Sequence, residues 1–132
     1  MIVVDTSALI AILKTEDQAA ACEAALNRAT TCLISAATLT EALIVSARRR
    51  FDAEMKELLS LFSPEVIDVT TARAEQAADA YRRFGKNFHP ASLNFGDCFA
   101  YATAREFGCP LPYIGEDFAQ TDLVSALSVA QP

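Results

Sequence analysis

The sequence predicts a single α/β domain in which a central parallel sheet is flanked by helices on both faces. Short β-branched or aliphatic runs alternate along the chain with longer segments of helical periodicity, the pattern of parallel strands joined by crossover helices. The 132 residues, 52% of them hydrophobic, suffice for one core. We therefore expect residues 1–132 to form one domain, which argues against a disordered chain or a two-domain enzyme.

The first elements are a strand followed by two helices and a second strand. Residues 2–4 form a continuous β-branched run, and Asp5-Thr6-Ser7 ends it as a helix-capping segment. Helices are predicted over 8–13 and 17–27 from their apolar and small residues at helical spacing. Residues 32–34 are the second strand.

Two helices and a third strand occupy the middle of the chain. The helix over 37–50 has an apolar stripe and a cationic last turn that suits the negative end of the helix dipole. The next helix, over 52–62, has apolar residues at spacings of three and four and is closed by Pro64. The third strand is predicted over 66–69.

The last third of the chain contains the one long loop that the sequence predicts. Thr70 and Thr71 cap a helix that Gly85 stops, as glycine commonly does in the left-handed conformation. The loop over 85–95 follows, and loops of this length inside compact domains tend to be functional.

A helix over 96–107 follows this loop, and two short strands complete the predicted sheet. Gly108 and Pro110 end the helix. The fourth strand is predicted over 111–114 and the fifth over 127–129.

Charge, cysteines and hydropathy restrict the class of protein. The formal charge of −6 argues against non-specific binding of duplex DNA, which requires many Lys and Arg residues. The four cysteines form no CxxC pair, so we expect buried thiols in a reducing compartment. There is no basic leader and no apolar run of the ~20 residues that a membrane span needs. A cytoplasmic protein without a membrane partner is expected.

Four carboxylates fall where a parallel sheet would bind a ligand. Asp5 ends the first strand, Asp97 lies in the first turn of the 96–107 helix, and Asp117 follows the fourth strand. Glu41 lies in an otherwise apolar helix stretch and should be half-buried. Each has a purely structural alternative: Asp5 and Asp117 as helix caps, Asp97 as a favourable charge on a helix dipole, and Glu41 as the partner of an arginine.

Together, the four acids indicate a cation site. Carboxylates gathered at one sheet edge repel one another, and oxygen ligands select Mg²⁺, or Mn²⁺ in its place. Such a site can activate a water molecule and stabilise the charge that develops on a phosphodiester. This predicts a metal-dependent hydrolase of phosphodiester bonds.

The same segments carry a family resemblance over essentially the whole chain. The opening IVVDTSAL, the TLTEAL helix with Glu41, the LNFGDCFAYA segment with Asp97 and the late GEDF resemble a PIN-domain ribonuclease of the VapC toxin type. The resemblance implies an Mg²⁺-dependent endoribonuclease, the toxin of a toxin–antitoxin pair, silenced by a cognate antitoxin. Its catalytic and metal residues would be Asp5, Glu41, Asp97 and Asp117, gathered by a sheet of order 3-2-1-4-5.

The resemblance further implies structured RNA as substrate, with tRNA the leading candidate, and a homodimer that joins its antitoxin in a hetero-oligomer. The fourth acidic position departs from the family pattern. Tyr113, Ile114 and Gly115 stand where many relatives carry a Thr followed by an Asp or Asn. Whether Glu116 assists Asp117, and whether one or two ions bind, stays open.

Six further residues are assigned to the substrate. A hydroxyl of Thr6 or Ser7 could orient a water, although both also suit helix capping. Basic residues interleave with phenylalanines beside the long loop, a combination that suits single-stranded RNA. The substrate-binding residues are therefore predicted to be Thr6, Ser7, Arg82, Lys86, His89 and Asn94.

Other α/β proteins with acids at a sheet edge match the residues less well. A phospho-accepting signalling receiver has an acidic doublet at its first strand and a late lysine, whereas Val4 precedes Asp5 and no lysine follows Lys86. A haloacid-dehalogenase-type phosphatase needs a second aspartate at the position of Ser7. A non-catalytic binding module would not need all four acids.

Overall fold

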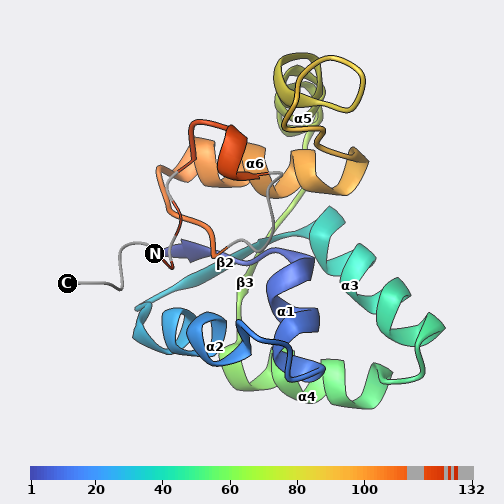
Figure 1. Ribbon diagram of the computed structural model, residues 1–132, viewed down its shortest axis with the longest axis vertical. Helices are drawn as coiled ribbons and strands as arrows, with labels where there is room; N and C mark the ends of the chain where they lie inside the picture. Colours follow the sequence, from blue (N-terminus) through green and yellow to red (C-terminus); the bar gives the residue numbers. More distant parts are fainter. Residues whose placement is uncertain (113–117, 124, 126, 128–132) are drawn as a thin grey trace.

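The computed structural model describes residues 1–112, 118–123, 125 and 127, and it has the predicted α/β layers (Figure 1). The strands β1 (Ile2–Val3), β2 (Cys32–Ser35) and β3 (Glu65–Ile67) are parallel, and β2 lies between the other two. The register pairs Ile2 with Cys32 and Leu33 with Glu65. Their carboxyl ends therefore meet at one edge of the sheet.

Helices cover both faces of this sheet (Figure 1). Four of them pack on one face or beside it: α1 (Thr6–Leu13), α2 (Ala19–Arg28), α3 (Ala36–Arg48) and α4 (Asp52–Phe62). On the opposite face lie α5 (Thr71–Phe84) and α6 (Phe95–Phe107), followed later by the short 3₁₀ helix η1 (Phe118–Gln120).

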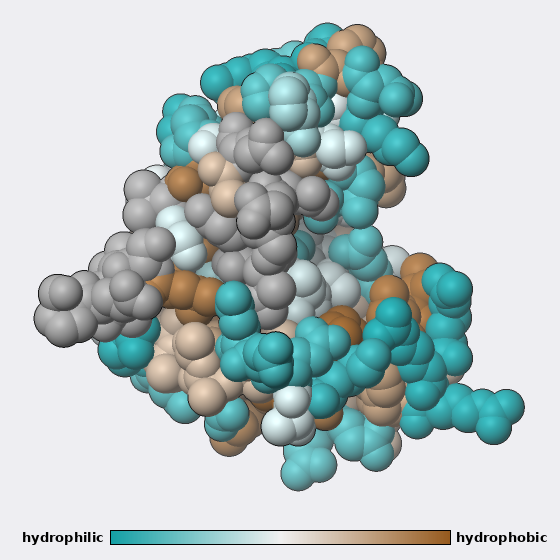
Figure 2. Space-filling view, in the orientation of Figure 1, coloured by the Kyte–Doolittle hydropathy of each residue, from teal (hydrophilic) through white to brown (hydrophobic). Residues whose placement is uncertain are grey.

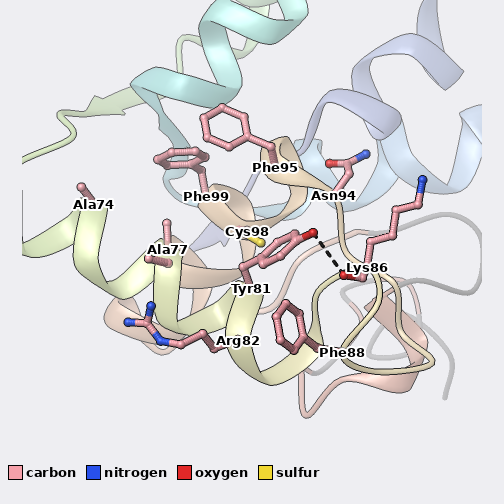
Figure 3. Close-up of a pocket in the computed structure, with 11 residues that line it drawn as sticks. Ala74, Ala77, Tyr81, Arg82, Lys86, Phe88, Asn94, Phe95, Cys98 and Phe99 are labelled. Atoms are coloured by element: carbon pink, nitrogen blue, oxygen red, sulfur yellow. Dashed lines mark hydrogen bonds between the residues drawn. The ribbon is translucent and has the colours of Figure 1, made fainter.

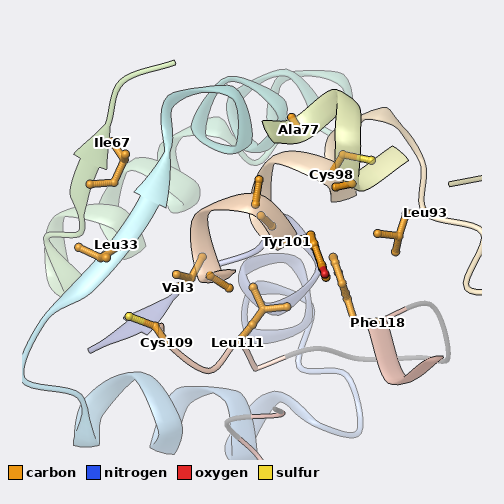
Figure 4. Close-up of a cluster of buried hydrophobic side chains, with 14 of the residues drawn as sticks. Val3, Leu33, Ile67, Ala77, Leu93, Cys98, Tyr101, Cys109, Leu111 and Phe118 are labelled. Atoms are coloured by element: carbon orange, nitrogen blue, oxygen red, sulfur yellow. The ribbon is translucent and has the colours of Figure 1, made fainter. Parts of the chain in front are cut away.

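The strands divide the core into two because successive side chains of a strand point to opposite faces. Val3 and Leu33 pack with α5 and α6, as Figure 4 shows. Ile2, Val4 and Ile34 pack with the helices of the other face. β1 and β2 are thus buried on both faces, as expected of a parallel sheet.

Beyond β1, the predicted strand order stays a prediction. The described residues contain three strands, in the order β3-β2-β1. The Val3 N–H donates to the carbonyl of Pro110 on the edge of β1 away from β2, and Leu111 forms an isolated parallel bridge with Ser125. Residues 113–114 of the predicted fourth strand and 128–129 of the fifth lie outside the described part of the chain.

Several element boundaries differ from the predicted ones. β3 ends at Ile67, two residues before the predicted end. α1 begins at Thr6, two residues before the predicted start, because Asp5 caps it. α6 begins at Phe95, inside the predicted loop, because Asn94 is its cap. The prediction of α4 was correct at both ends.

Gly85 ends α5 as predicted, but for a different reason. Its backbone is extended, with φ of −74°, and so lacks the left-handed conformation expected of a glycine cap. A Cβ at this position would overlap the carbonyl oxygen and the ring of Tyr81. Glycine is therefore required here by close packing.

The four cysteines are buried free thiols, as predicted. Cys98 and Cys109 belong to the core on the α5–α6 side, and Cys32 belongs to the core on the other side. Burial raises the pKa of Cys98 to about 11, with a smaller contribution from the Asp97 charge.

Hydrophilic side chains dominate the surface around α5 and the loop after it, at the top of Figure 2. A few hydrophobic side chains interrupt them. The exposed hydrophobic residues of the loop after α5 and of the start of α6 are Phe88 and Phe95, which are 65% and 78% exposed. In the described part of the chain, no helix is both long and apolar enough to cross a membrane.

Substitution of Tyr101 by Phe is expected to lower the free energy of unfolding by about 1 kcal/mol at neutral pH. The buried Tyr101 hydroxyl donates a 2.6 Å hydrogen bond to Asp122, and this contact lowers the pKa of that carboxyl. A lowered pKa stabilises the fold above the ordinary value of 3.8, and the gain is lost as pH falls through the folded-state value. Urea denaturation at neutral and acidic pH should show the two proteins converging in acid; a constant difference would contradict the assignment.

Candidate metal centre

Asp5 lies at the carboxyl end of β1 and caps α1. Its Oδ2 accepts hydrogen bonds from the Ser7 hydroxyl at 2.6 Å and from the Ser7 backbone N–H at 3.3 Å. The side chain is buried, and burial raises the pKa of the Asp5 carboxyl above its ordinary value. The Ser7 hydrogen bonds lower that pKa and the nearby Glu41 charge raises it, with a net upward shift. The cap that we considered as an alternative is thus present, and it coexists with a second carboxylate close by.

Glu41 lies in the second turn of α3 and is half-buried, as predicted. Its Oε1 accepts a 2.7 Å hydrogen bond from the Thr6 hydroxyl, which holds it against the start of α1. Its carboxylate also lies against the first turn of α6, where a Cβ on Gly96 would overlap it. No ion pair between Glu41 and an arginine occurs among residues 1–112, 118–123, 125 and 127.

Asp97 is the third residue of α6 and completes a capping box with Asn94. The Asn94 Oδ1 accepts from the Asp97 N–H at 2.8 Å, and the Asp97 Oδ2 accepts from the Asn94 N–H at 3.0 Å. Asp97 directly follows Gly96, the residue that contacts Glu41. The capping role considered as an alternative for Asp97 is therefore present, and Asp97 is the next residue in the sequence after the glycine that contacts Glu41.

Of the four acids that the sequence predicted, the described part of the structure brings Asp5 and Glu41 together. Asp5 and Glu41 are close enough to repel each other. Among the described side chains, no group of three or more Asp, Glu, His or Cys residues is arranged to hold a metal ion. Asp117 and Glu116 lie outside the described residues.

The Asp5–Glu41 pair nevertheless fits a hard divalent cation. Two carboxylates that repel each other, one of them buried, are stabilised by a positive charge between them. Mg²⁺ is bound through one or two carboxylates and keeps several of its own waters, so it does not need a complete cage of side chains. The donor set, made of oxygen atoms, matches that preference.

Apart from His89, the remaining predicted site residues divide into two groups. Thr6 and Ser7 both contact the carboxylates, as the hydrogen bonds above show. Arg82, Lys86 and Asn94 line a pocket of about 770 Å³ between α5, the loop after it and α6 (Figure 3). Arg82 also forms an exposed ion pair with Asp79 at 2.6 Å.

His89 belongs to neither group. Its Nδ1 accepts a hydrogen bond from the Ala91 N–H at 3.0 Å, and its ring packs edge-on against Phe84. These contacts brace the loop that the sequence predicted over 85–95. The predicted contact of His89 with substrate stays a prediction.

Sequence reasoning missed two residues beside the predicted site. Gly96, used only to mark the start of a helix, makes room for the Glu41 carboxylate. Phe95, assigned to the loop, is the first residue of α6 and lines the same pocket as Asn94. Glycine in the first turn of a helix is a weak signal of close packing, because alanine is intrinsically favoured there.

Comparison with known sequences gives a consistent result over nearly the whole chain. Residues 2–123 match the profile of the PIN domain. Ribonuclease VapC30 of Mycobacterium tuberculosis is 39% identical over 126 residues, which cover 93% of this chain and 96% of that protein. Ribonuclease VapC28 of the same organism is 43% identical over 129 residues, which cover 95% and 97%.

Solved structures share the fold at lower sequence identity. The toxin VapC20 of Mycobacterium tuberculosis, described as cleaving the sarcin-ricin loop, superposes with a TM-score of 0.74 at 20% identity over 94% of this chain and 97% of that one. A toxin–antitoxin complex from Klebsiella pneumoniae contains a chain with a TM-score of 0.72 at 19% identity, over 96% and 98%.

Proposed function

Because the chain belongs to the PIN-domain family and to its VapC ribonucleases, we propose that it is a divalent-cation-dependent endoribonuclease and the toxin of a toxin–antitoxin pair, acting in the cytoplasm. The observation that carries the proposal is the pair of adjacent carboxylates, Asp5 and Glu41, at the carboxyl edge of the sheet beside the first turn of α6. The comparisons do not favour the signalling receiver considered above.

The proposed ligands of Mg²⁺, or of Mn²⁺ in its place, are Asp5, Glu41 and Asp97, with Asp117 as the fourth acid. The chemistry that such an ion supplies when bound is activation of a water molecule and stabilisation of charge on the phosphodiester. The chain's own residues fix the ligands in place. Ser7 orients the Asp5 carboxylate, and Thr6 orients that of Glu41.

Structured RNA is the proposed substrate, cut within a single-stranded loop, with tRNA as the leading candidate. Support comes from the cations Arg82 and Lys86, which line the pocket beside Asn94. These two cations can bind a polyanion locally, although the formal charge of the whole chain is −6. A relative of the same fold is itself described as cleaving an RNA loop.

A cognate antitoxin is the proposed protein partner, together with a second copy of the chain in a homodimer. The support is that a chain of the same fold was solved in a toxin–antitoxin complex. If the antitoxin silences the toxin by binding it tightly, the two proteins should copurify when they are produced together.

Sequencing of RNA ends after brief induction tests the proposed activity. The protein should halt growth and produce new RNA ends at defined sites when it is made without its antitoxin. The Asp97→Asn variant, which keeps the shape of the side chain but loses its charge, should produce neither effect. Intact RNA and normal growth with the wild-type protein would refute the proposal.

Substitution of Gly96 by Ala is expected to lower RNA cleavage by about 100-fold, because the new Cβ displaces the Glu41 carboxylate. Thermal stability should hold or rise slightly, since alanine is favoured over glycine in a helix and the displaced group is the end of a flexible side chain. Steady-state cleavage of a labelled RNA and thermal unfolding measure the two effects.

A double-substitution cycle provides the control for Gly96. If the substitution acts through Glu41, adding Gly96→Ala to a Glu41→Gln variant should cost little further activity. Equal losses in both backgrounds would show that Gly96 acts by another route.

A further inference from the structure

The pocket between α5 and α6 has the properties of a binding site for a flat aromatic group. Two pairs of aromatic rings, each packed edge to face, stand on its opposite sides (Figure 3). Tyr81 and Phe88 form one pair with ring centroids 5.7 Å apart, and Phe95 and Phe99 form the other at 5.1 Å. Three alanines of α5 line the space between the walls and leave it about 770 Å³ in volume.

Two of these rings are exposed to solvent to an unusual degree. Phe88 is 65% exposed and Phe95 is 78% exposed, although both belong to well-defined edge-to-face pairs. Exposed aromatic rings that line one cavity are typical of a surface that a ligand covers. A planar ligand could stack on their free faces without displacing any core side chain.

Charge indicates which kind of planar ligand fits. Arg82 and Lys86 stand at opposite ends of the pocket, and no acid is among the described residues that line it (Figure 3). In a chain with 17 acids and 11 basic residues, this lining selects a ligand that carries negative charge. A nucleotide within an RNA strand combines a flat base with a phosphate on each side.

The pocket lies next to the proposed active site along α6. Asn94, Phe95 and Cys98 line the pocket, and they flank Asp97 on both sides in the first turn of α6. A nucleic-acid strand whose phosphodiester lies at Asp97 would therefore carry its neighbouring base past Phe95.

We propose that this pocket binds one unstacked nucleobase of the RNA substrate, adjacent to the phosphodiester that is cut. The inference rests on the proposed ribonuclease function and adds a substrate subsite to it. Phe88 and Phe95 stack on the base, while Arg82 and Lys86 contact the flanking phosphates. Stacking on aromatic rings binds single-stranded bases with little dependence on sequence. The subsite thus favours a splayed loop over a duplex, whose bases remain paired.

The test uses a single-stranded RNA oligonucleotide carrying one 2-aminopurine, a fluorescent base that is quenched on stacking. Binding is measured in EDTA, and KM and kcat for cleavage are measured separately with Mg²⁺. Phe88→Ala and Phe95→Ala should each weaken binding and raise KM by about tenfold, and both should reduce the quenching. An otherwise identical oligonucleotide with an abasic site in place of the 2-aminopurine should bind the wild type and both alanine variants with equal affinity.

Matched variants separate stacking from folding. Phe88→Tyr and Phe95→Tyr keep the ring and should stay within about twofold of the wild type. Leu61→Ala, at an exposed leucine of α4, should change nothing. If both alanine variants show the quenching and the KM of the wild type and still cleave RNA, the subsite proposal is wrong. The proposed ribonuclease function is unaffected by that result.

One further outcome also decides against the subsite. If the alanine variants bind RNA normally but escape their antitoxin or lose their dimer on size-exclusion chromatography, the pocket binds protein. If the wild type cleaves no RNA under any condition, the proposed function itself fails, which is a different result.

Discussion

Replacement of Asp5 by Asn is expected to lower RNA cleavage by about a thousandfold without destabilising the protein. The loss follows because an amide is a poor ligand for Mg²⁺, and the ion accounts for several kcal/mol of transition-state stabilisation. The unchanged stability of the variant follows from the burial of the Asp5 side chain. Folding raises the pKa of the Asp5 carboxyl, so the ionised side chain weakens the fold at neutral pH, and a neutral amide removes that cost.

Two measurements on one variant check this prediction. Cleavage of a labelled RNA should drop to near background, and the thermal midpoint in EDTA should equal or exceed that of the wild type. Asp52→Asn, an exposed aspartate in the first turn of α4, is the matched control and should keep full activity. An Asp5→Asn protein that cleaves RNA at the wild-type rate would remove Asp5 from the proposed site.

Chelation of divalent cations is expected to abolish cleavage, and Mg²⁺ is expected to raise the thermal midpoint of the wild-type protein. An ion that binds only the folded state at 100 times its Kd adds about 2.7 kcal/mol to the free energy of unfolding. Relief of the repulsion between Asp5 and Glu41 contributes to the affinity for the ion, and so to the gain at a given Mg²⁺ concentration.

Thermal scans with and without Mg²⁺, together with calorimetric titration, measure this effect. Asp5→Asn should show little of the Mg²⁺-dependent shift, and Mn²⁺ should substitute for Mg²⁺ in the wild type. An identical shift in the wild type and in Asp5→Asn would place the ion elsewhere on the protein.

The layers of the fold could be predicted from the sequence. Along most of the chain, the spacing of apolar residues indicates the same helices and strands as the positions of the glycines and prolines that end them. Pro64 and the spacing of apolar residues fixed both ends of α4 correctly. The predicted start of α6 was wrong because residues 85–95 have the composition of a loop. The signal that could have corrected it is Asn94 followed three residues later by Asp97, the pattern of a capping box.

The proximity of Asp5 and Glu41 could also be predicted, because Asp5 ends β1 at the carboxyl edge of the sheet and Glu41, in the helix after β2, can lean toward the same edge. What the sequence could not supply is how closely α3 approaches α6. That approach depends on the missing side chain of Gly96 and on the Thr6 hydroxyl, neither of which has a periodic pattern. The caps at Asp5 and Asp97 are a further lesson, because a cap does not preclude a second role for the same carboxylate.

The buried thiols on the two sides of the sheet provide a built-in reporter of local opening. Cys98 and Cys109 lie in the α5–α6 core, whereas Cys32 lies in the core of the other face. A thiol reagent can reach each of them only when its own layer separates from the sheet. The labelling rate of each cysteine, resolved by mass spectrometry, would therefore show whether the α5–α6 layer opens independently of the helices on the other face of the sheet.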